Sequence, residues 1–189
     1  LSNGQIISVY HKINLPNYGV FDEKRYFSQG SDACVINIEG VQIGITICED
    51  IWFAEPIKKS KEAGAELLVN INASPYQFHK NRQRLKVLRQ RVAEQKIPIV
   101  YVNQVGGQDE LVFDGESLCL NKEGSLCLQA PAFEVGIFNV QYSKTKRDLI
   151  ESECIYTELS KHASIYRALV LGVKDYIEKN QFKSVVFGL

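Results

Sequence analysis

The chain has 189 residues, of which 45% are hydrophobic and 23% charged, and its 22 Lys and Arg balance its 22 Asp and Glu. A formal net charge of zero excludes the basic field expected of a protein that binds nucleic acid or an anionic membrane surface. No apolar stretch could cross a bilayer, and the five cysteines and three histidines have neither disulfide-framework nor zinc-site spacing. Together with the lack of a signal-peptide pattern at the N-terminus, this composition predicts a reducing, cytoplasmic location.

The two ends of the chain predict that more protein lies beyond them. The sequence contains no methionine, opens on a predicted hairpin turn before a strand over residues 6–10, and closes on a predicted strand over residues 184–189. Natural domains seldom begin and end inside sheet structure, because termini usually lie loose at the surface. We therefore expect an interior piece of a longer protein.

Charged side chains of possible chemical interest follow the first predicted strand at two places. Lys12 fits a solvated surface charge, but an ammonium held beside a thiol would favour the thiolate and stabilise an oxyanion during acyl transfer. Asp22 and Glu23 lie between aromatic residues and, taken alone, predict a partly buried loop held by ion pairs.

The strand-to-helix junction at Cys48 is the most informative feature. Residues 41–47 are mostly β-branched and apolar and predict a buried strand, whereas Glu49 and Asp50 follow at once and a helical pattern covers residues 58–63. Such a turn can present a side chain and free backbone N–H groups to one small cavity, which suits a reactive thiolate. Cys48 by itself also fits a small buried apolar residue.

The next segments predict an α/β arrangement. Strands are predicted over residues 66–71 and 97–103, with a long amphipathic helix over residues 79–95 between them. The apolar side of this helix carries Leu85, Leu88, Val92 and Ala93, and its basic residues, Arg84 among them, are expected elsewhere. Repeated strand–helix–strand order predicts a parallel portion with right-handed crossovers.

The pattern changes after residue 103. Residues 106–115 hold three carboxylates between glycines and have no histidine nearby, so we expect a structured loop at a pocket mouth or a subunit contact rather than a metal site. A hairpin is predicted over residues 116–129 and a strand over residues 133–140. A polar linker, a helix over residues 158–179 and the final strand are expected to follow.

Four stretches in one order carry a family resemblance: HKINLPNYGVFDEKRYF, GITICEDIW, NASPY and YVNQVGGQDELVFDG. Over nearly its whole length the chain resembles the glutamine-hydrolysing domain of the glutamine-dependent NAD(+) synthetase family, within the nitrilase superfamily. The resemblance implies an α/β fold, a nitrilase-type sandwich of two mixed β-sheets flanked by helices, present here in part. It implies a glutaminase domain over residues 1–141 and a linker over 142–157. Residues 158–189 would be the first helix and strand of a Rossmann-like ATP-pyrophosphatase synthetase domain.

The resemblance also implies roles for individual residues. Cys48 would be the nucleophile that attacks the side-chain amide of glutamine, and Lys12 would hold the oxyanion together with the backbone N–H of Glu49. Glu23 would orient the lysine. The glutamine pocket would be lined by Tyr18, Trp52 and Ser74. No metal ligand and no cofactor is implied for these residues.

The family's general-base glutamate belongs to an early strand-to-helix segment that these residues do not include, so we expect the chain alone to have little or no glutaminase activity. ATP, Mg²⁺ and deamido-NAD are implied as partners of the synthetase domain, and a homo-oligomer is expected. Two other functions stay open: a stand-alone nitrilase-superfamily amidase acting on another small amide, and a non-catalytic scaffold.

Overall fold

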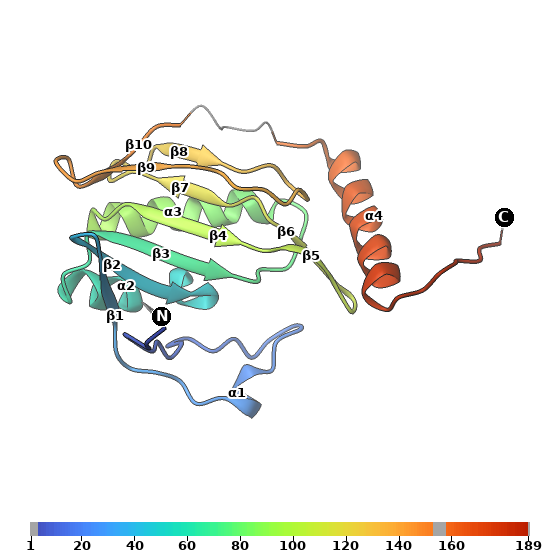
Figure 1. The fold of residues 1–189 in the computed structure, drawn as a ribbon, viewed down its shortest axis with the longest axis horizontal. Helices are drawn as coiled ribbons and strands as arrows, with labels where there is room; N and C mark the ends of the chain where they lie inside the picture. Colours follow the sequence, from blue (N-terminus) through green and yellow to red (C-terminus); the bar gives the residue numbers. More distant parts are fainter. Residues whose placement is uncertain (1–3, 153–157, 189) are drawn as a thin grey trace.

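The centre of the fold is a six-stranded mixed sheet, seen in a computed structural model that describes residues 4–152 and 158–188 (Figure 1). Its strands, in spatial order, are β1 (Cys34–Ile38), β2 (Val41–Ile47), β3 (Leu67–Asn72), β4 (Ile99–Asn103), β7 (Leu118–Leu120) and β8 (Leu126–Gln129). β2, β3 and β4 are parallel, and the outer pairings are antiparallel. The predicted parallel portion and the hairpin over 116–129 are therefore confirmed.

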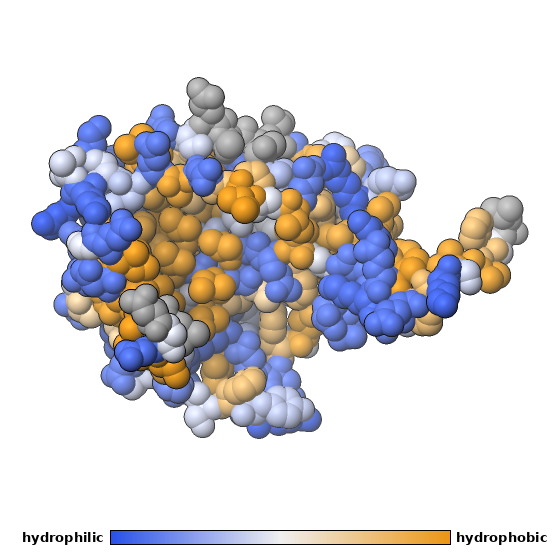
Figure 2. Space-filling model, viewed as in Figure 1, coloured by the Kyte–Doolittle hydropathy of each residue, from blue (hydrophilic) through white to orange (hydrophobic). Residues whose placement is uncertain are grey.

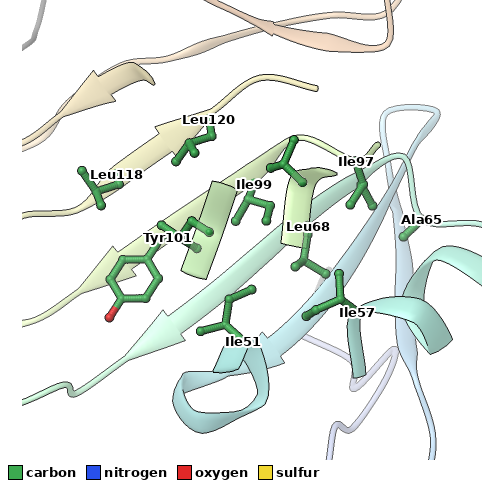
Figure 3. Close-up of a cluster of buried hydrophobic side chains, with 11 residues drawn as sticks. Ile51, Ile57, Ala65, Leu68, Ile97, Ile99, Tyr101, Leu118 and Leu120 are labelled. Atoms are coloured by element: carbon green, nitrogen blue, oxygen red, sulfur yellow. The ribbon is translucent and has the colours of Figure 1, made fainter. Parts of the chain in front are cut away.

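Helices α2 (Ala54–Glu62) and α3 (Lys80–Gln95) cover one face of this sheet. Side chains from both helices and from β3, β4 and β7 form the main apolar core, in which Ile57, Leu68 and Ile99 are fully buried (Figure 3). Burying one such side chain contributes about 1.5–3 kcal/mol. This core fixes the strands whose ends carry the site.

The predicted helix over 79–95 is confirmed, but its buried side differs from the prediction. Ala93 is exposed, whereas Arg84 is completely buried. The buried positions of α3 are Arg84, Leu88, Arg91 and Val92. Their spacing of four, seven and eight residues defines one helical stripe. The N-terminal end of this stripe lies over polar strand ends rather than over apolar core, which explains why it accepts an arginine.

A second cluster lies on the opposite face of the sheet and includes Leu67, Cys119, Cys127 and Leu149. Part of its cover is the antiparallel hairpin β9 (Gln141–Ser143) and β10 (Asp148–Ile150), in a stretch predicted as polar linker. Three-residue strands are too short to give a readable alternation of apolar and polar residues.

Two further predicted strands are wrong. Residues 133–140 form no strand, and Val135 and Ile137 are 88% and 93% exposed. Residues 6–10 form none either, because no neighbouring strand pairs with them in the described part of the chain. Apolar β-branched composition alone does not provide the hydrogen-bonding partner that a strand needs. The first helix after this segment is the short α1 (Glu23–Tyr26).

The C-terminal helix α4 (Lys161–Lys179) packs against the two-stranded sheet of β5 (Val105–Gln108) and β6 (Leu111–Asp114) (Figure 1). The predicted helix is confirmed, but residues 184–188 form no strand, and Leu189 and residues 153–157 lie outside the described part. Within residues 4–152 and 158–188 there is one mixed sheet, and no helix is long and apolar enough to cross a membrane.

Candidate active site

Cys48 lies at the junction between β2 and the 3₁₀ helix η1 (Cys48–Trp52), where the chain turns sharply. It is a free cysteine with a φ of +44°, in the left-handed region that costs an L-residue about 1–2 kcal/mol. A left-handed residue at this position lets the backbone reverse direction while its side chain stands clear of both elements. The local strain is therefore concentrated on the residue that the sequence singles out.

The side chain of Cys48 forms part of the wall of a cavity of about 220 Å³. Tyr18, Trp52 and Ser74, the three residues expected to bind substrate, line the same cavity. They come from the N-terminal segment, from η1 and from the loop after β3, so the tertiary structure brings together residues far apart in the chain. The cavity is further lined by Glu49, Pro75, Tyr76, Lys80 and Leu111.

Lys12 and Glu23 form an ion pair in which the ammonium donates to both carboxylate oxygens at 2.8 Å. Their side chains are 13% and 25% exposed, so water screens the pair only in part. The pKa of the Cys48 thiol is raised overall, first by burial, whereas the nearby Lys12 ammonium acts to lower it and the Glu49 carboxylate acts to raise it. A backbone hydrogen bond from Ala73 also lowers this pKa. Lys12 is thus placed to favour the thiolate.

The carboxylate of Glu49 is a feature that sequence reasoning missed, since only the backbone of this residue was expected to matter. The hydroxyl of Tyr18 donates to its two oxygens at 2.9 and 3.0 Å. Burial and then the bonded Glu49 carboxylate raise the pKa of Tyr18 to about 12. The cavity therefore has one fixed negative charge beside the cysteine.

Lys80 provides the opposite charge and was also missed. It begins α3, lines the cavity, and its ammonium lies 4.6 Å from the ring centre of Trp52. Burial lowers the pKa of Lys80, and the nearby Arg84 lowers it further. Its position in the first turn of the helix that follows the NASPY stretch is the sequence signal that could have identified it.

A buried polar network holds the loop that carries Ser74. The guanidinium of Arg84 donates to both carboxylate oxygens of Asp114 at 2.9 and 3.0 Å, and to the backbone oxygen of Ser74 at 3.0 Å. The side-chain oxygen of Asn103 accepts from the backbone N–H of Ser74 at 2.9 Å. Arg84 was expected away from the apolar side of its helix, so this role was not foreseen.

The Gly-rich stretch over 106–115 forms most of the β5–β6 hairpin, and Leu111 from this hairpin lines the cavity. In the part of the chain that the structure describes, no three His, Cys, Asp or Glu side chains gather closely enough to hold a metal ion.

The chain is similar to known proteins in both sequence and structure. Residues 2–151 match the family model described as carbon-nitrogen hydrolase. The chain is 44% identical over its full length to a glutamine-dependent NAD(+) synthetase from Xanthomonas campestris, and it spans 35% of that relative's length. It superposes on glutamine-dependent NAD+ synthetase from Acinetobacter baumannii, solved with ADP, with a TM-score of 0.91 and 38% identity, covering 98% of this chain and 35% of that one.

A more distant structural relative is a mutant amidase from Nesterenkonia sp. AN1, in which acrylamide has added to the active-site cysteine. The TM-score is 0.56 at 26% identity, over 66% of this chain and 48% of that protein. The fold is thus the α/β nitrilase type, with a mixed sheet flanked by helices. From the family match, the geometry around Cys48 and these relatives, we conclude that the chain belongs to the carbon-nitrogen hydrolase family.

Proposed function

We propose that this chain is the glutaminase part of a glutamine-dependent NAD(+) synthetase and that Cys48 is its nucleophile. The observation that carries the proposal is the position of Cys48, which occupies a left-handed turn in the wall of a cavity, close to the Lys12 ammonium. The relatives that match the chain over its full length are named as this enzyme, and a structural relative reacts at its active-site cysteine.

The reaction would begin with attack of the Cys48 thiolate on the amide carbon of glutamine. The oxyanion that forms would be stabilised by the Lys12 ammonium, which Glu23 orients, and by the backbone N–H of Glu49. The C–N bond then breaks, and the nitrogen leaves as ammonia with the proton that came from the thiol. Water attacks the resulting thioester, which releases glutamate and regenerates the thiol.

The charges in the cavity match an amino-acid substrate. We propose that Glu49, with Tyr18, binds the α-ammonium group of glutamine and that Lys80 binds its α-carboxylate. Trp52 would pack against the aliphatic part, and Ser74 would complete the pocket with its hydroxyl.

A general base is still needed for this chemistry. The two carboxylates that act on Cys48 electrostatically are both engaged: Glu23 with Lys12, and Glu49 with Tyr18. We propose that the base lies outside these 189 residues, so that this chain alone turns over little or no glutamine. Loss of a general base typically costs about 10²–10⁴-fold in rate.

The rest of the proposed reaction belongs to the whole protein. Ammonia from Cys48 would amidate deamido-NAD at a synthetase domain that uses ATP with Mg²⁺, and the ADP bound to the Acinetobacter baumannii relative supports ATP use. We propose that residues 158–189 begin this domain. We propose that the linker begins after the β9–β10 hairpin and not at residue 142, because this hairpin packs against the large sheet. The whole protein is proposed to form homo-oligomers.

The test uses the whole protein with two nitrogen sources. Cys48→Ala should abolish NAD formation from glutamine but leave formation from ammonium salts intact, because only the first route needs the thiol. Cys34→Ala, a buried cysteine of β1 that does not line the cavity, should retain both activities. Glutamine-dependent activity that persists in folded Cys48→Ala protein would overturn the proposal.

The similarity to an amidase keeps a second function in view, hydrolysis of a simple small amide. The opposite charges of Glu49 and Lys80 distinguish glutamine hydrolysis from hydrolysis of a simple amide. If glutamine is the substrate, Glu49→Gln and Lys80→Ala should raise the KM for glutamine much more than the KM for an uncharged aliphatic amide, while any change in the reactivity of Cys48 alters kcat for both substrates alike. Equal effects on the two KM values would favour the amidase. A scaffold without catalysis would show no turnover of either substrate by the whole protein.

A further inference from the structure

Asp50 is a completely buried carboxylate two residues after the nucleophile, and it accepts four hydrogen bonds. Its Oδ2 accepts from the hydroxyl of Tyr10 at 2.7 Å and from the backbone N–H of Ile47 at 3.0 Å. Its Oδ1 accepts from the backbone N–H groups of Ile13 at 3.1 Å and Asn14 at 2.8 Å. One side chain thus joins the end of β2, the turn after it and the N-terminal segment.

The N-terminal partners of Asp50 lie on both sides of Lys12 in the chain. This segment forms no strand, so no sheet ladder fixes its backbone among the described residues. Besides the bonds to Asp50, the backbone oxygen of Lys12 accepts from the N–H of Gly30 at 2.8 Å. The position of the Lys12 backbone relative to the Cys48 turn therefore depends largely on one carboxylate.

We propose that Asp50 is a positioning residue that fixes Lys12 beside Cys48. It does not line the cavity and does not touch the substrate; it acts through the segment that carries the ammonium. The inference deepens the proposed function, because it rests on Lys12 and Cys48 working together. Hydrogen bonds from backbone N–H groups to a carboxylate are charge-assisted and about twice as strong as neutral ones, which suits an anchor for a loop without secondary structure.

Asparagine is the most informative replacement because it keeps the shape of Asp50 and changes its bonding. An amide has only one acceptor oxygen, whereas both oxygens of Asp50 accept from backbone N–H groups. Whether the amide oxygen of the asparagine replaces Oδ1 or Oδ2 of Asp50, its NH₂ group must face at least one backbone N–H. The Lys12 segment should then lose part of its anchor.

The experiment measures the alkylation rate of Cys48 by iodoacetamide against pH in the whole protein, read at this cysteine by peptide mass spectrometry. Asp50→Asn should slow alkylation near neutral pH about tenfold, because an opposite charge nearby is worth one or more pKa units to a thiolate. Lys12→Ala should slow it to a similar extent. Adding Asp50→Asn to Lys12→Ala should change nothing further.

The sign of the effect separates positioning from direct electrostatics. With Lys12 fixed, removing a negative charge could only lower the thiol pKa and speed alkylation. Glu49 and Glu23 also act on the thiol, and neither is altered. Asp148→Asn is the matched control: Asp148 Oδ1 accepts from the backbone N–H groups of Lys122 and Leu149 at 3.0 and 2.9 Å, in the β10 region. It should leave the alkylation rate unchanged.

Faster or unchanged alkylation in Asp50→Asn, or slowing that adds to that of Lys12→Ala, would overturn the inference. If Asp50→Asn does not fold, Asp50→Glu carries the test: it keeps the charge but its longer arm cannot keep all four bonds in place. A slowing that disappears in the Lys12→Ala background supports positioning, and an unchanged rate contradicts it. Alkylation of Cys48 does not require glutamine turnover. If the proposed function is wrong, the whole protein will therefore show no glutaminase activity, while its alkylation rate will still depend on Asp50 and Lys12 as described.

Discussion

At the scale of single residues, buried polar side chains gather at one end of the large sheet. Asn103 ends β4 and donates to Asp114, which also accepts from Arg84, beneath the loop that carries Ser74. In open α/β sheets the carboxyl ends of parallel strands are where binding sites form. A buried polar group is costly unless it is hydrogen-bonded, so each member of this network depends on the others.

Arg84→Met should therefore be strongly destabilising. The change leaves the Asp114 carboxylate buried without its bidentate partner, and breaking a buried pair in this way costs about 3–5 kcal/mol. Arg82→Met is the matched control on the same helix, because the Arg82–Glu158 pair is exposed and such pairs contribute about 0–1 kcal/mol. Urea unfolding of both variants checks this. Equal losses of stability would contradict the buried-network interpretation.

Glu116 predicts a pH dependence of stability. Burial, and then the neighbouring Asp114 carboxylate, raise its pKa from 4.5 to about 7. The folded state therefore holds a proton that the unfolded state has lost, and the contribution to stability falls as pH rises from about 4.5 to about 7. At about pH 8, Glu116→Gln should be more stable than the parent by on the order of 1–3 kcal/mol. This difference in stability should be smaller at about pH 5. Urea unfolding at the two pH values, with the exposed Glu110→Gln as control, measures this difference.

At the scale of elements, the decisive feature is the turn from β2 into η1. β2 is buried between two strands and cannot shift, and the chain must reverse at once into η1 and α2. The left-handed backbone of Cys48 makes this reversal possible. The same turn brings the Asp50 carboxylate back to the N–H of Ile47, which closes it.

Replacing Cys48 by glycine and by alanine should reveal this backbone strain. At a φ of +44°, glycine avoids the steric cost that alanine bears, and we expect Cys48→Gly to be roughly 0.5–1 kcal/mol more stable than Cys48→Ala. Cys34 lies in the regular strand β1, where the order should be reversed. Urea unfolding of the four variants tests this, and alanine proving the more stable at both sites would exclude stored strain at Cys48.

At the scale of the whole molecule, part of the sheet face opposite α2 and α3 is uncovered. Ile47, Ile71 and Val102 are neighbours across β2, β3 and β4, and Ile71 and Val102 are 52% and 43% exposed. Figure 2 shows apolar side chains gathered over the strands on the face turned to the viewer. Soluble monomers rarely expose large contiguous apolar patches, and such patches commonly mark an interface.

We therefore expect this chain to self-associate through that face. Ile71→Lys should reduce association, because a lysine in the middle of the apolar row would bury an unpaired charge in the contact. Val135→Lys, at a position 88% exposed in the segment over 133–140, should not change association. Analytical ultracentrifugation across a concentration series measures both. Unchanged association of Ile71→Lys would place the contact elsewhere.

Local sequence patterns are enough to predict the main helices and strands and to single out the residues that could carry out chemistry. Long apolar strands and the periodic helices over 79–95 and 158–179 follow from local patterns, so the amino-acid sequence is enough to predict them. The short strands of the hairpin at 141–150 depend on neighbours that no local pattern encodes. The same holds for the strands wrongly expected at 6–10, at 133–140 and at 184–188.

The assembly of the site depends on contacts between segments that are distant in the chain. A cysteine, a lysine and three pocket residues could be named from the sequence, but Glu49, Lys80, Arg84 and Asp50 acquire their roles from contacts with segments distant in the chain. Arg84 belongs to a basic helix and looks like a surface charge until the fold places Asp114 beneath it. The physical reason is that a side chain's chemistry is intrinsic, whereas its burial, partners and pKa depend on what the fold brings next to it.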